Sequence, residues 1–209
     1  MSEKKDFSAM LKLGVVLAIY SAAACIGLAF VYSVTSEIIA QRQQADLENS
    51  LRELFPEADD FRPLTGIVIS DPLVTLVGDS GDPENTGAFA VIKNSSAIGV
   101  ALRVSRGSYS GPVVMLVGTG TDGKIKGVKI LENTDTPGLG ANAASKSYYI
   151  DRANGIHFYD QFRGKAVADP FMPKQDIAAI TAATITSTAV SAAVKAAGEA
   201  AMIWIGSGK

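Results

Sequence analysis

Hydroxyl side chains are concentrated in the stretch ITAATITSTAV, residues 180–190, which precedes an apolar run near the end of the chain. The hydroxyl residues of this stretch are Thr181, Thr184, Thr186, Ser187 and Thr188. Such side chains cap the first turn of a helix, because their oxygen accepts a bond from a backbone N–H that has no partner within the helix. The same N–H groups, together with the positive end of the helix dipole, also bind phosphate. The stretch is therefore either a helix cap or a phosphate-binding site, and these residues alone leave both interpretations open.

A second stretch, ENTDTPGLG at residues 132–140, has the composition of a rigid loop. Pro137 fixes one φ angle, while Gly138 and Gly140 allow positive φ and close approach of the backbone. A loop of this kind can press its backbone and Leu139 against a flat ring. Taken alone, the same residues are those of an ordinary Thr-Pro-Gly turn.

Composition argues against several other chemistries. The net charge of −2 over 209 residues provides no basic surface for nucleic acid. Cys25 is the only cysteine, so we expect no disulfide framework and no cysteine metal site. His157 is the only histidine, which argues against a histidine-rich metal site and against a Ser-His-Asp triad. We therefore assign no catalytic residue and no metal ligand, and we expect His157 to be a packed or surface residue.

An uncharged apolar run, Leu13–Val34, lies near the start of the chain. A helix of this length spans about 33 Å at about 1.5 Å per residue, enough to cross a hydrocarbon core of about 30 Å. A cleaved signal peptide has a shorter apolar region, of about 7–15 residues. The alanines before Cys25 are typical of a lipoprotein cleavage site, but the apolar run continues beyond that cysteine. An uncleaved transmembrane anchor is therefore the favoured interpretation.

The charges beside this run predict its orientation. Lys4, Lys5 and Lys12 precede it, whereas Arg42 follows it and is accompanied by acidic residues. The positive-inside rule then places the N-terminus in the cytoplasm and the rest of the chain outside the cytoplasmic membrane. The expected organisation is a cytoplasmic N-terminus at 1–12, a transmembrane helix at 13–35, a helical stalk at 36–60 and an extracytoplasmic domain at 61–209.

The rest of the chain begins with helix-forming residues and continues with β-rich runs. Ser36–Phe55 is rich in residues that favour helices, and Pro56 should end that helix. From Gly66 onward, β-rich runs alternate with short turns, which predicts a mostly antiparallel sheet. The runs are GIVIS, LVTLV, GAFAVIK, AIGVALRVS, PVVMLVGTG and KIKGVKILE. Asp122-Gly123 predicts a type I′ hairpin turn between the last two runs.

Helical patterns return at 141–153 and again from about Ile185 to Ile205. The second of these segments has few polar positions, so most of its circumference should be covered. We expect an α+β protein, in which a single N-terminal transmembrane helix is followed by a mostly antiparallel sheet with packed helices.

The segment Thr181–Thr186 resembles the flavinylation motif of the FMN-binding domain family. In that motif Asp or Ser is followed by Gly or Ala, Ala or Ser, the acceptor Thr, any residue, and Ser or Thr. The acceptor falls on Thr184, and the departure is Thr181 at the first position, which keeps a hydroxyl. The 132–140 loop is similar to the family's Glu-Thr-Pro-Gly-Leu-Gly segment, with Asp135 in place of Glu. Weaker similarities are Tyr109-Ser110-Gly111-Pro112 and residues 161–165.

Together with the anchor, these similarities over roughly residues 85–205 resemble the G subunits of the Rnf complexes, which are ion-translocating ferredoxin:NAD oxidoreductases. The C subunits of the Na⁺-translocating NADH:quinone oxidoreductases are near relatives with the same anchor and motifs, but they are usually longer. The length of 209 residues fits the Rnf protein better, and the quinone reductase protein stays as the alternative.

This resemblance implies a covalent cofactor. A separate Mg-dependent flavin transferase would use FAD to attach FMN to Thr184 as a phosphoester, and Thr181, Thr186 and Ser187 with nearby amides would hold its phosphate. The loop from Asp135 to Gly140 would contact the flavin ring or its edge. The full set of expected cofactor-binding residues is Thr181, Ala183, Thr184, Ile185, Thr186, Ser187, Asp135, Thr136, Pro137, Gly138, Leu139 and Gly140.

The resemblance also implies partners within a membrane complex. Electrons would arrive from the A and E subunits, which hold the membrane iron–sulfur centre, and leave to a second covalent FMN on the D subunit. The apolar run carries no charge within it, unlike an ion-conducting helix, so ion translocation would belong to these partners.

Two interpretations from other classes of protein stay open. A non-redox, membrane-anchored binding or assembly module could use its alanine-rich last helix to dock a partner, and it would be colourless. A membrane-tethered hydrolase could use one of the threonines, although the sequence offers no convincing base for it.

Overall fold

The computed structural model describes residues 3–78 and 86–207. It contains two units, Met1–Glu48 and Asn49–Lys209, and each is described by itself. Helix α1, Glu3–Leu54, forms the first unit and continues into the start of the second. It ends just before Pro56, whose ring and missing N–H are incompatible with a further helical turn. The predicted anchor and the helical part of the predicted stalk are thus one continuous helix.

Two helices in the described residues are long and apolar enough to cross a membrane. One is the segment Lys12–Ser36 of α1, none of which is buried within the protein. The other is the last helix, α2, Thr184–Gly206, which is 56% buried and serves as the core helix of the second unit. The segment Lys12–Ser36 agrees with the predicted membrane anchor.

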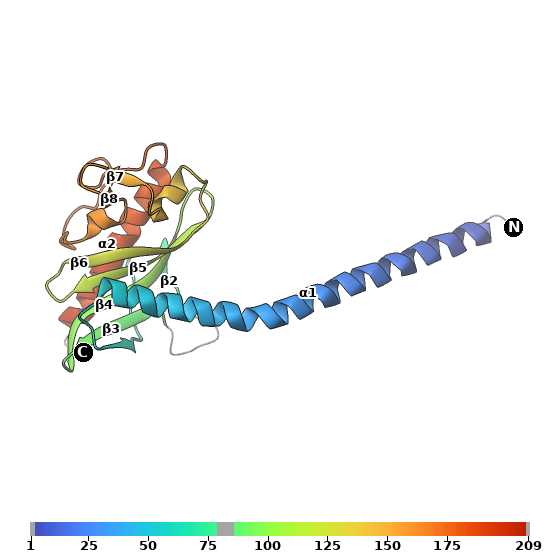
Figure 1. Ribbon diagram of the computed structural model, residues 1–209, viewed down its shortest axis with the longest axis horizontal. Helices are drawn as coiled ribbons and strands as arrows, with labels where there is room; N and C mark the ends of the chain where they lie inside the picture. Colours follow the sequence, from blue (N-terminus) through green and yellow to red (C-terminus); the bar gives the residue numbers. More distant parts are fainter. Residues whose placement is uncertain (1–2, 79–85, 208–209) are drawn as a thin grey trace. The chain divides into compact units, whose positions relative to one another are not determined.

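The second unit is built on an antiparallel sheet (Figure 1). Its strands are β1 Asp60–Pro63, β2 Val74–Leu76, β3 Ala88–Lys93, β4 Ser96–Gly107, β5 Pro112–Gly120 and β6 Ile125–Asn133. The order across the sheet is β1-β3-β4-β5-β6, and β2 pairs with the remaining length of β4. Every pairing is antiparallel, with registers such as Leu102↔Val117 between β4 and β5. The predicted α+β class is therefore confirmed, and five of the six predicted strand runs correspond to β2, β3, β4, β5 and β6.

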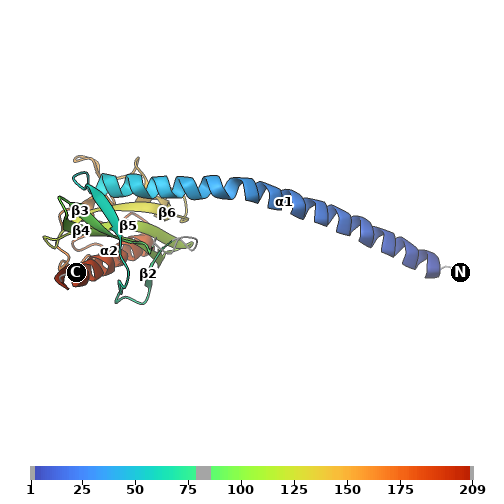
Figure 2. The same cartoon turned by 90° about the horizontal axis from the view of Figure 1, so that it is seen from below.

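Helix α2 covers one face of this sheet, across β4 and β5 (Figure 2). The apolar side chains of the sheet that face it are Val100, Leu102, Val104, Val113, Met115 and Val117. Alanines and valines from α2 complete this core, with Val190, Ala193, Val194 and Ala197 fully buried. Short side chains let the helix lie close to the sheet, which explains why a helix with so few polar residues is stable here. The prediction that most of its circumference is covered is confirmed.

The opposite face of the sheet is covered by the last turn of α1 and the residue after it. Leu54 and Phe55 are 7% and 1% exposed and lie over glycines of the sheet. A Cβ at Gly118 would lie 2.7 Å from the Phe55 ring, and one at Gly127 would lie 2.7 Å from Leu54. These glycines therefore create the space that the two side chains fill. Residues 49–60, placed in the stalk by the sequence pattern, belong to the compact second unit.

Two predicted features of the sheet differ from the structure. The run GIVIS, residues 66–70, is not a strand, because Gly66 has a φ of +76° and Val68 is 76% exposed. The edge of β3 pairs instead with β1, which aligns Asp60 with Ile92. Strand β1 ends in Pro63 and is mostly exposed, so its sequence has no alternating apolar pattern that would predict a strand.

The hairpin predicted at Asp122-Gly123 is present, but its turn is of another type. Of these two residues only Gly123, at +73°, has a positive φ, so the turn is not type I′. The type I′ requirement is met instead between β3 and β4, where Asn94 and Ser95 have φ of +49° and +65°. Asparagine tolerates positive φ, but the sequence Asn-Ser-Ser does not distinguish a type I′ turn from an ordinary turn.

The helix predicted at 141–153 is wrong. A short 3₁₀ helix, η1 Gly140–Ala144, is followed by a hairpin of β7 Tyr149–Asp151 and β8 Ile156–His157, and then by η2 Asp160–Phe162. The Asp151 carboxylate accepts bonds from the backbone N–H groups of Ala153 and Asn154, which closes a turn in place of a helix. Tertiary packing of the preceding loop therefore overrides a weak helical preference.

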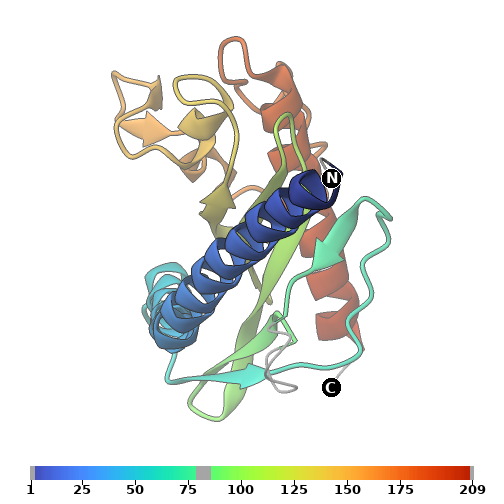
Figure 3. The ribbon, with the colours of Figure 1, turned by 90° about the vertical axis from the view of Figure 1, so that its right-hand side faces the viewer.

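Three connections meet at one end of the sheet (Figure 3). They are the β4–β5 connection at 108–111, the loop after β6 at 134–139 and the start of α2. Hydrogen bonds join all three, as described next.

Candidate functional site

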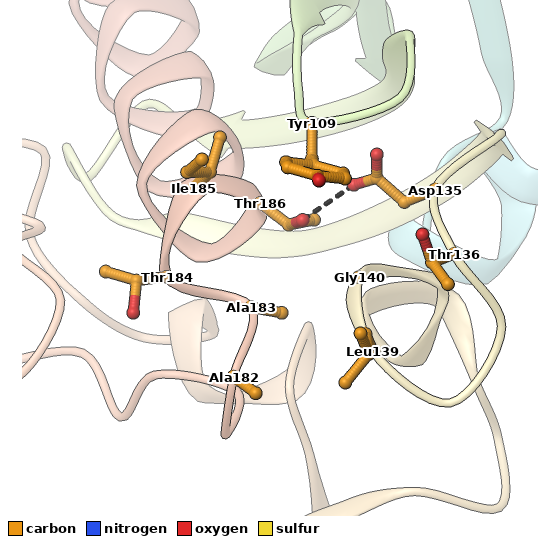
Figure 4. A pocket seen from close by; sticks show the side chains of 10 residues that line it. All are labelled: Tyr109, Asp135, Thr136, Leu139, Gly140, Ala182, Ala183, Thr184, Ile185 and Thr186. Atoms are coloured by element: carbon orange, nitrogen blue, oxygen red, sulfur yellow. Dashed lines mark hydrogen bonds between the residues drawn. The ribbon is translucent and has the colours of Figure 1, made fainter.

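The Asp135 carboxylate joins these three segments (Figure 4). Ser108 Oγ donates to Asp135 Oδ2 at 2.5 Å and the Ser110 backbone N–H donates to Oδ1 at 2.7 Å. From the first turn of α2, Thr186 Oγ1 donates to Oδ2 at 2.6 Å. Asp135 is 5% exposed and Thr186 is 1% exposed, so both sides of this contact are buried. The carboxylate therefore fixes the start of the helix relative to the two loops.

Two opposing effects set the protonation of this carboxyl group. Burial raises the pKa of Asp135, while the hydrogen bonds from Ser108, Thr186 and the Ser110 and Tyr109 amides lower it further than burial raises it. The net pKa lies below the ordinary value of an aspartate. Asp135 is therefore an ionised group held by neutral donors.

The loop after β6 is shaped around the same pair of residues. Asn133 Nδ2 donates to the Gly140 carbonyl at 2.9 Å, and its Oδ1 accepts from the Asp135 N–H at 3.0 Å. A Cβ at Gly140 would lie 2.6 Å from Asp135 Oδ2, so this position has no room for a side chain. Gly138 has a φ of +78°, the conformation for which the sequence pattern expected a glycine.

The start of α2 is not capped by one of its threonines. Ala183 takes the N-cap position without a side-chain bond. Instead Ser187, within the first turn, accepts from the Ile180 N–H and donates to the Ala183 carbonyl, both at 3.0 Å. The preceding Ala182 has a φ of +58°, which is uncommon for a residue with a Cβ and is typical of strained functional segments.

Thr184 is the exposed hydroxyl at this helix start. No hydrogen bond in the described chain engages its Oγ1, whereas Thr188 Oγ1 donates to the Thr184 carbonyl at 2.8 Å. The first backbone bond of the helix runs from the Ser187 N–H to the Ala183 carbonyl. Within the described residues, the N–H groups of Thr184, Ile185 and Thr186 therefore have no backbone acceptor, as expected for the first turn of a helix.

A cavity of about 590 Å³ lies between these segments. Its lining residues are Tyr109, Asp135, Thr136, Leu139, Gly140, Ala182, Ala183, Thr184, Ile185 and Thr186. Large apolar side chains stand at its rim, since Tyr109 is 71%, Ile185 56% and Leu139 41% exposed. Cavities of this size hold small organic ligands and cofactors, with apolar walls and a few polar groups that fix orientation.

Most of the predicted cofactor-binding residues meet at this cavity. The eight that line it are Asp135, Thr136, Leu139, Gly140, Ala183, Thr184, Ile185 and Thr186. Pro137, Gly138 and Thr181 lie outside the lining. Ser187 also lies outside the lining: it is 0% exposed, and its hydroxyl is bonded to Ile180 and Ala183. Thr186 likewise donates its hydroxyl to Asp135.

Sequence reasoning missed two lining residues, Tyr109 and Ala182. The Tyr-Ser-Gly-Pro segment before β5 carried a weak signal for Tyr109. Other aromatic residues lie elsewhere: His157 stacks between Tyr149 and Tyr159, with ring centroids 4.4 and 5.4 Å away. This agrees with the expectation of a packed histidine. In the described residues no group of acidic, histidine or cysteine side chains could hold a metal ion.

Comparison with known proteins identifies the family. Residues 108–199 match the FMN-binding domain family, and residues 1–54 match the RnfG N-terminal region. The G subunit of the proton-translocating ferredoxin:NAD(+) oxidoreductase complex of Clostridium ljungdahlii is 30% identical over 205 residues, covering 95% of each chain. The chain belongs to the RnfG family. The predicted family is thus confirmed.

Other RnfG relatives show similar coverage. The G subunit of the Na(+)-translocating ferredoxin:NAD(+) oxidoreductase complex of Acetobacterium woodii is 29% identical over 198 residues and covers 90% of each chain. The G subunit of the ion-translocating oxidoreductase complex of Methanosarcina acetivorans is 28% identical over 200 residues. The crystal structure of Shewanella oneidensis NqrC matches 73% of each chain at 16% identity, with a TM-score of 0.43.

The site of this RnfG family member suits an FMN group. Its volume, its apolar rim and the unbonded hydroxyl of Thr184 beside the N–H groups of a helix start fit a flat ring joined to a phosphate. Thr184 and the backbone N–H of Ile185 would lie at the phosphate, and the side chains of Tyr109, Leu139 and Ile185 at the ring.

Proposed function

We propose that the chain is the FMN-carrying G subunit of an ion-translocating ferredoxin:NAD oxidoreductase complex, with FMN attached through its phosphate to Thr184. One observation carries this proposal. Thr184 lines the same cavity of about 590 Å³ as the loop around Asp135 and Leu139, and its hydroxyl has no partner among the described residues. Family membership supports the cofactor, because residues 108–199 match the FMN-binding domain.

The helix start would hold the phosphate. The N–H groups of Thr184, Ile185 and Thr186 have no backbone acceptor in the described chain, and the dipole of α2 places partial positive charge there. Ala182 and Ala183 have small side chains, so a phosphate can approach the backbone closely. Neither Lys nor Arg is among the described lining residues, so the peptide groups would supply the stabilising charge.

The attachment itself would be a phosphoryl transfer. Thr184 Oγ would attack the phosphorus on the FMN side of FAD, with cleavage of the anhydride bond and departure of AMP, and the hydroxyl proton would pass to a base of a separate flavin transferase. The exposure of Thr184 supports this step, because a second protein has to reach the hydroxyl. Thr186 and Ser187 would act by holding the helix start in place through their own hydrogen bonds.

The rim of the cavity would receive the flavin ring. When bound, FMN supplies one-electron and two-electron transfer. Tyr109, Leu139 and Ile185 present apolar surface from three different segments, and an aromatic ring packs well against such surface. Because electron transfer makes no bond to a substrate, the chain needs no catalytic acid, base or nucleophile.

The N-terminal helix and the family membership support a membrane anchor and partner subunits for this chain. The N-terminal apolar helix anchors the chain in the membrane, as befits a component of a membrane complex. We propose that residues 1–12 are cytoplasmic and that the FMN domain lies on the extracytoplasmic side, which the lysines before the apolar run support. Electrons would arrive from the iron–sulfur A and E subunits and leave to the D subunit, and ion movement would belong to those partners.

The test is the intact mass of the denatured chain, purified from membranes of cells that contain the flavin transferase. We expect a gain of one FMN less one water in the wild type and in Thr188→Val, the matched control on the same helix turn. Thr184→Val should lack this gain and keep its fold. If the wild-type chain has an unmodified mass, the interpretation as a non-redox assembly module is favoured. If Thr184→Val still carries covalent flavin, the attachment site is another residue.

A further inference from the structure

The cavity lining carries a single full side-chain charge among the described residues, and that charge is negative. Among the described lining residues, Asp135 is the only acidic or basic side chain. The partners of its carboxylate are two hydroxyls and the backbone N–H groups of Ser110 and Tyr109, all neutral. Two partly buried carboxylates elsewhere in the second unit do have basic partners. Asp71 contacts Arg106 at 2.5 Å, and Asp176 lies 3.5 Å from Lys165.

The Asp135 carboxylate keeps its charge. A carboxylate that accepts several hydrogen bonds is favoured in its ionised form, and here the donors come from three segments that the fold holds rigidly. Because only 5% of the Asp135 surface is exposed, solvent screens its charge weakly toward the cavity. A group bound in this cavity therefore experiences a negative potential from Asp135 that no basic side chain of the described lining offsets.

We infer that the Asp135 carboxylate holds the reduction potential of the FMN in this cavity below the value that a neutral residue would give. The inference rests on the proposed function, because it requires FMN at this site. Each electron that enters the flavin adds one negative charge unless a proton enters with it. The nearby carboxylate opposes that added charge, so reduction requires a stronger donor. Asp135 is in this role a tuning residue, which neither binds a substrate nor transfers a proton.

The experiment measures the reduction potential of the full-length chain carrying covalent FMN, by spectroscopic redox titration. We expect Asp135→Asn, which keeps the size of the side chain and removes its charge, to shift the potential to a more positive value. Asp135→Glu keeps the charge and should stay close to the wild type. An unchanged or more negative potential in Asp135→Asn would overturn the inference.

Two controls separate charge from geometry. Ser108→Ala removes one hydrogen bond to Asp135 but leaves the carboxylate charged, and Ser108 does not line the cavity. Asp176→Asn removes a carboxylate that likewise accepts backbone N–H bonds, at Phe171 and Met172, away from the cavity. Both should keep the potential of the wild type. If Ser108→Ala reproduced the shift of Asp135→Asn, the cause would be the hydrogen-bond geometry and the inference would be wrong.

A second neutral variant, Asp135→Ser, covers the case in which Asp135→Asn carries no flavin. Loss of FMN from both neutral variants, with FMN retained in Asp135→Glu, would assign the carboxylate to attachment and overturn the inference. Failure of the proposed function gives a different result, because the wild type itself would then carry no covalent flavin.

Discussion

At the scale of single residues, Asp135, Thr186 and Gly140 act as one unit. The hydroxyl of Thr186 reaches the carboxylate only because Gly140 leaves the space between them open. The sequence places Asp135 and Thr186 far apart, at a separation of 51 positions. The pattern Asp-Thr-Pro-Gly-Leu-Gly is therefore explained by contacts to the helix start as well as by the turn that it forms.

We expect Gly140→Ala to destabilise the second unit by about 1–3 kcal/mol, the range typical of overpacked sites. The added Cβ would lie 2.6 Å from Asp135 Oδ2 and would separate it from Thr186. Thermal unfolding followed by circular dichroism measures the effect. Gly107→Ala is the control, because a Cβ there meets nothing within 4 Å. Equal melting temperatures for the two variants would contradict this account of the loop.

The lowered pKa of Asp135 predicts a dependence of stability on pH. Because the folded-state pKa lies below that of the unfolded chain, the carboxylate contributes stability above the unfolded value of about 3.9. This contribution is lost as the pH falls through the folded-state pKa. Denaturant unfolding between about pH 6 and pH 3 should therefore show a steeper loss for the wild type than for Asp135→Asn. Parallel curves for the two proteins would show that Asp135 does not contribute.

At the scale of elements, the start of α2 depends on a serine within the helix. Ser187 bonds the N–H of Ile180 and the carbonyl of Ala183, so it ties the approach segment to the first turn. That segment includes Ala182 in the left-handed region, which positions the exposed Thr184. The same geometry suits Gly at the second position of the flavinylation motif, because Gly has no Cβ to oppose a positive φ.

Ser187→Ala should therefore lower the free energy of unfolding by about 1–3 kcal/mol, since it leaves the buried Ile180 N–H without its acceptor. The covalent FMN, measured by intact mass, should be retained. Thr188→Ala is the comparison, because Thr188 is exposed and its bond to the Thr184 carbonyl adds little. A stable Ser187→Ala protein without FMN would instead support direct contact of Ser187 with the phosphate.

At the scale of the whole molecule, the second unit includes the end of α1. Leu51, Leu54 and Phe55 are buried at 4%, 7% and 1% exposure, and the last two fill the space above Gly118 and Gly127. Removing them would expose this face of the sheet to water. The domain that carries the candidate site thus begins at Asn49, ahead of the first strand.

A chain shortened to begin at Asn49 should fold and accept FMN from the transferase. A chain that begins at Phe61 loses Leu54 and Phe55, and deletion of one large buried aromatic side chain alone costs about 3–5 kcal/mol. We expect the shorter chain to melt at a much lower temperature or to aggregate. Comparable melting temperatures for the two chains would show that the face of the sheet at Gly118 and Gly127 does not need to be covered by Leu54 and Phe55.

The sequence by itself determined the anchor, the antiparallel class, five of the strands and the last helix. These follow from local patterns: an uncharged apolar run, β-rich runs with short turns, and an alanine-rich segment. The two site motifs were also visible, because each occupies a few consecutive residues. Strand β1, the type I′ turn at Asn94-Ser95 and the β7–β8 hairpin were not visible, since contacts with distant residues stabilise them.

Only the tertiary structure decided how the hydroxyls of the threonine stretch are used. Thr184 lines the cavity and keeps an unbonded hydroxyl, Thr186 bonds Asp135, and Ser187 closes its own helix turn, although all three have similar chemistry in the sequence. The helix rotation that separates them is set by packing of α2 on the sheet. The same packing brings Tyr109 to the rim and buries the charge of Asp135 beside the cavity, because both depend on segments that meet only in the folded chain.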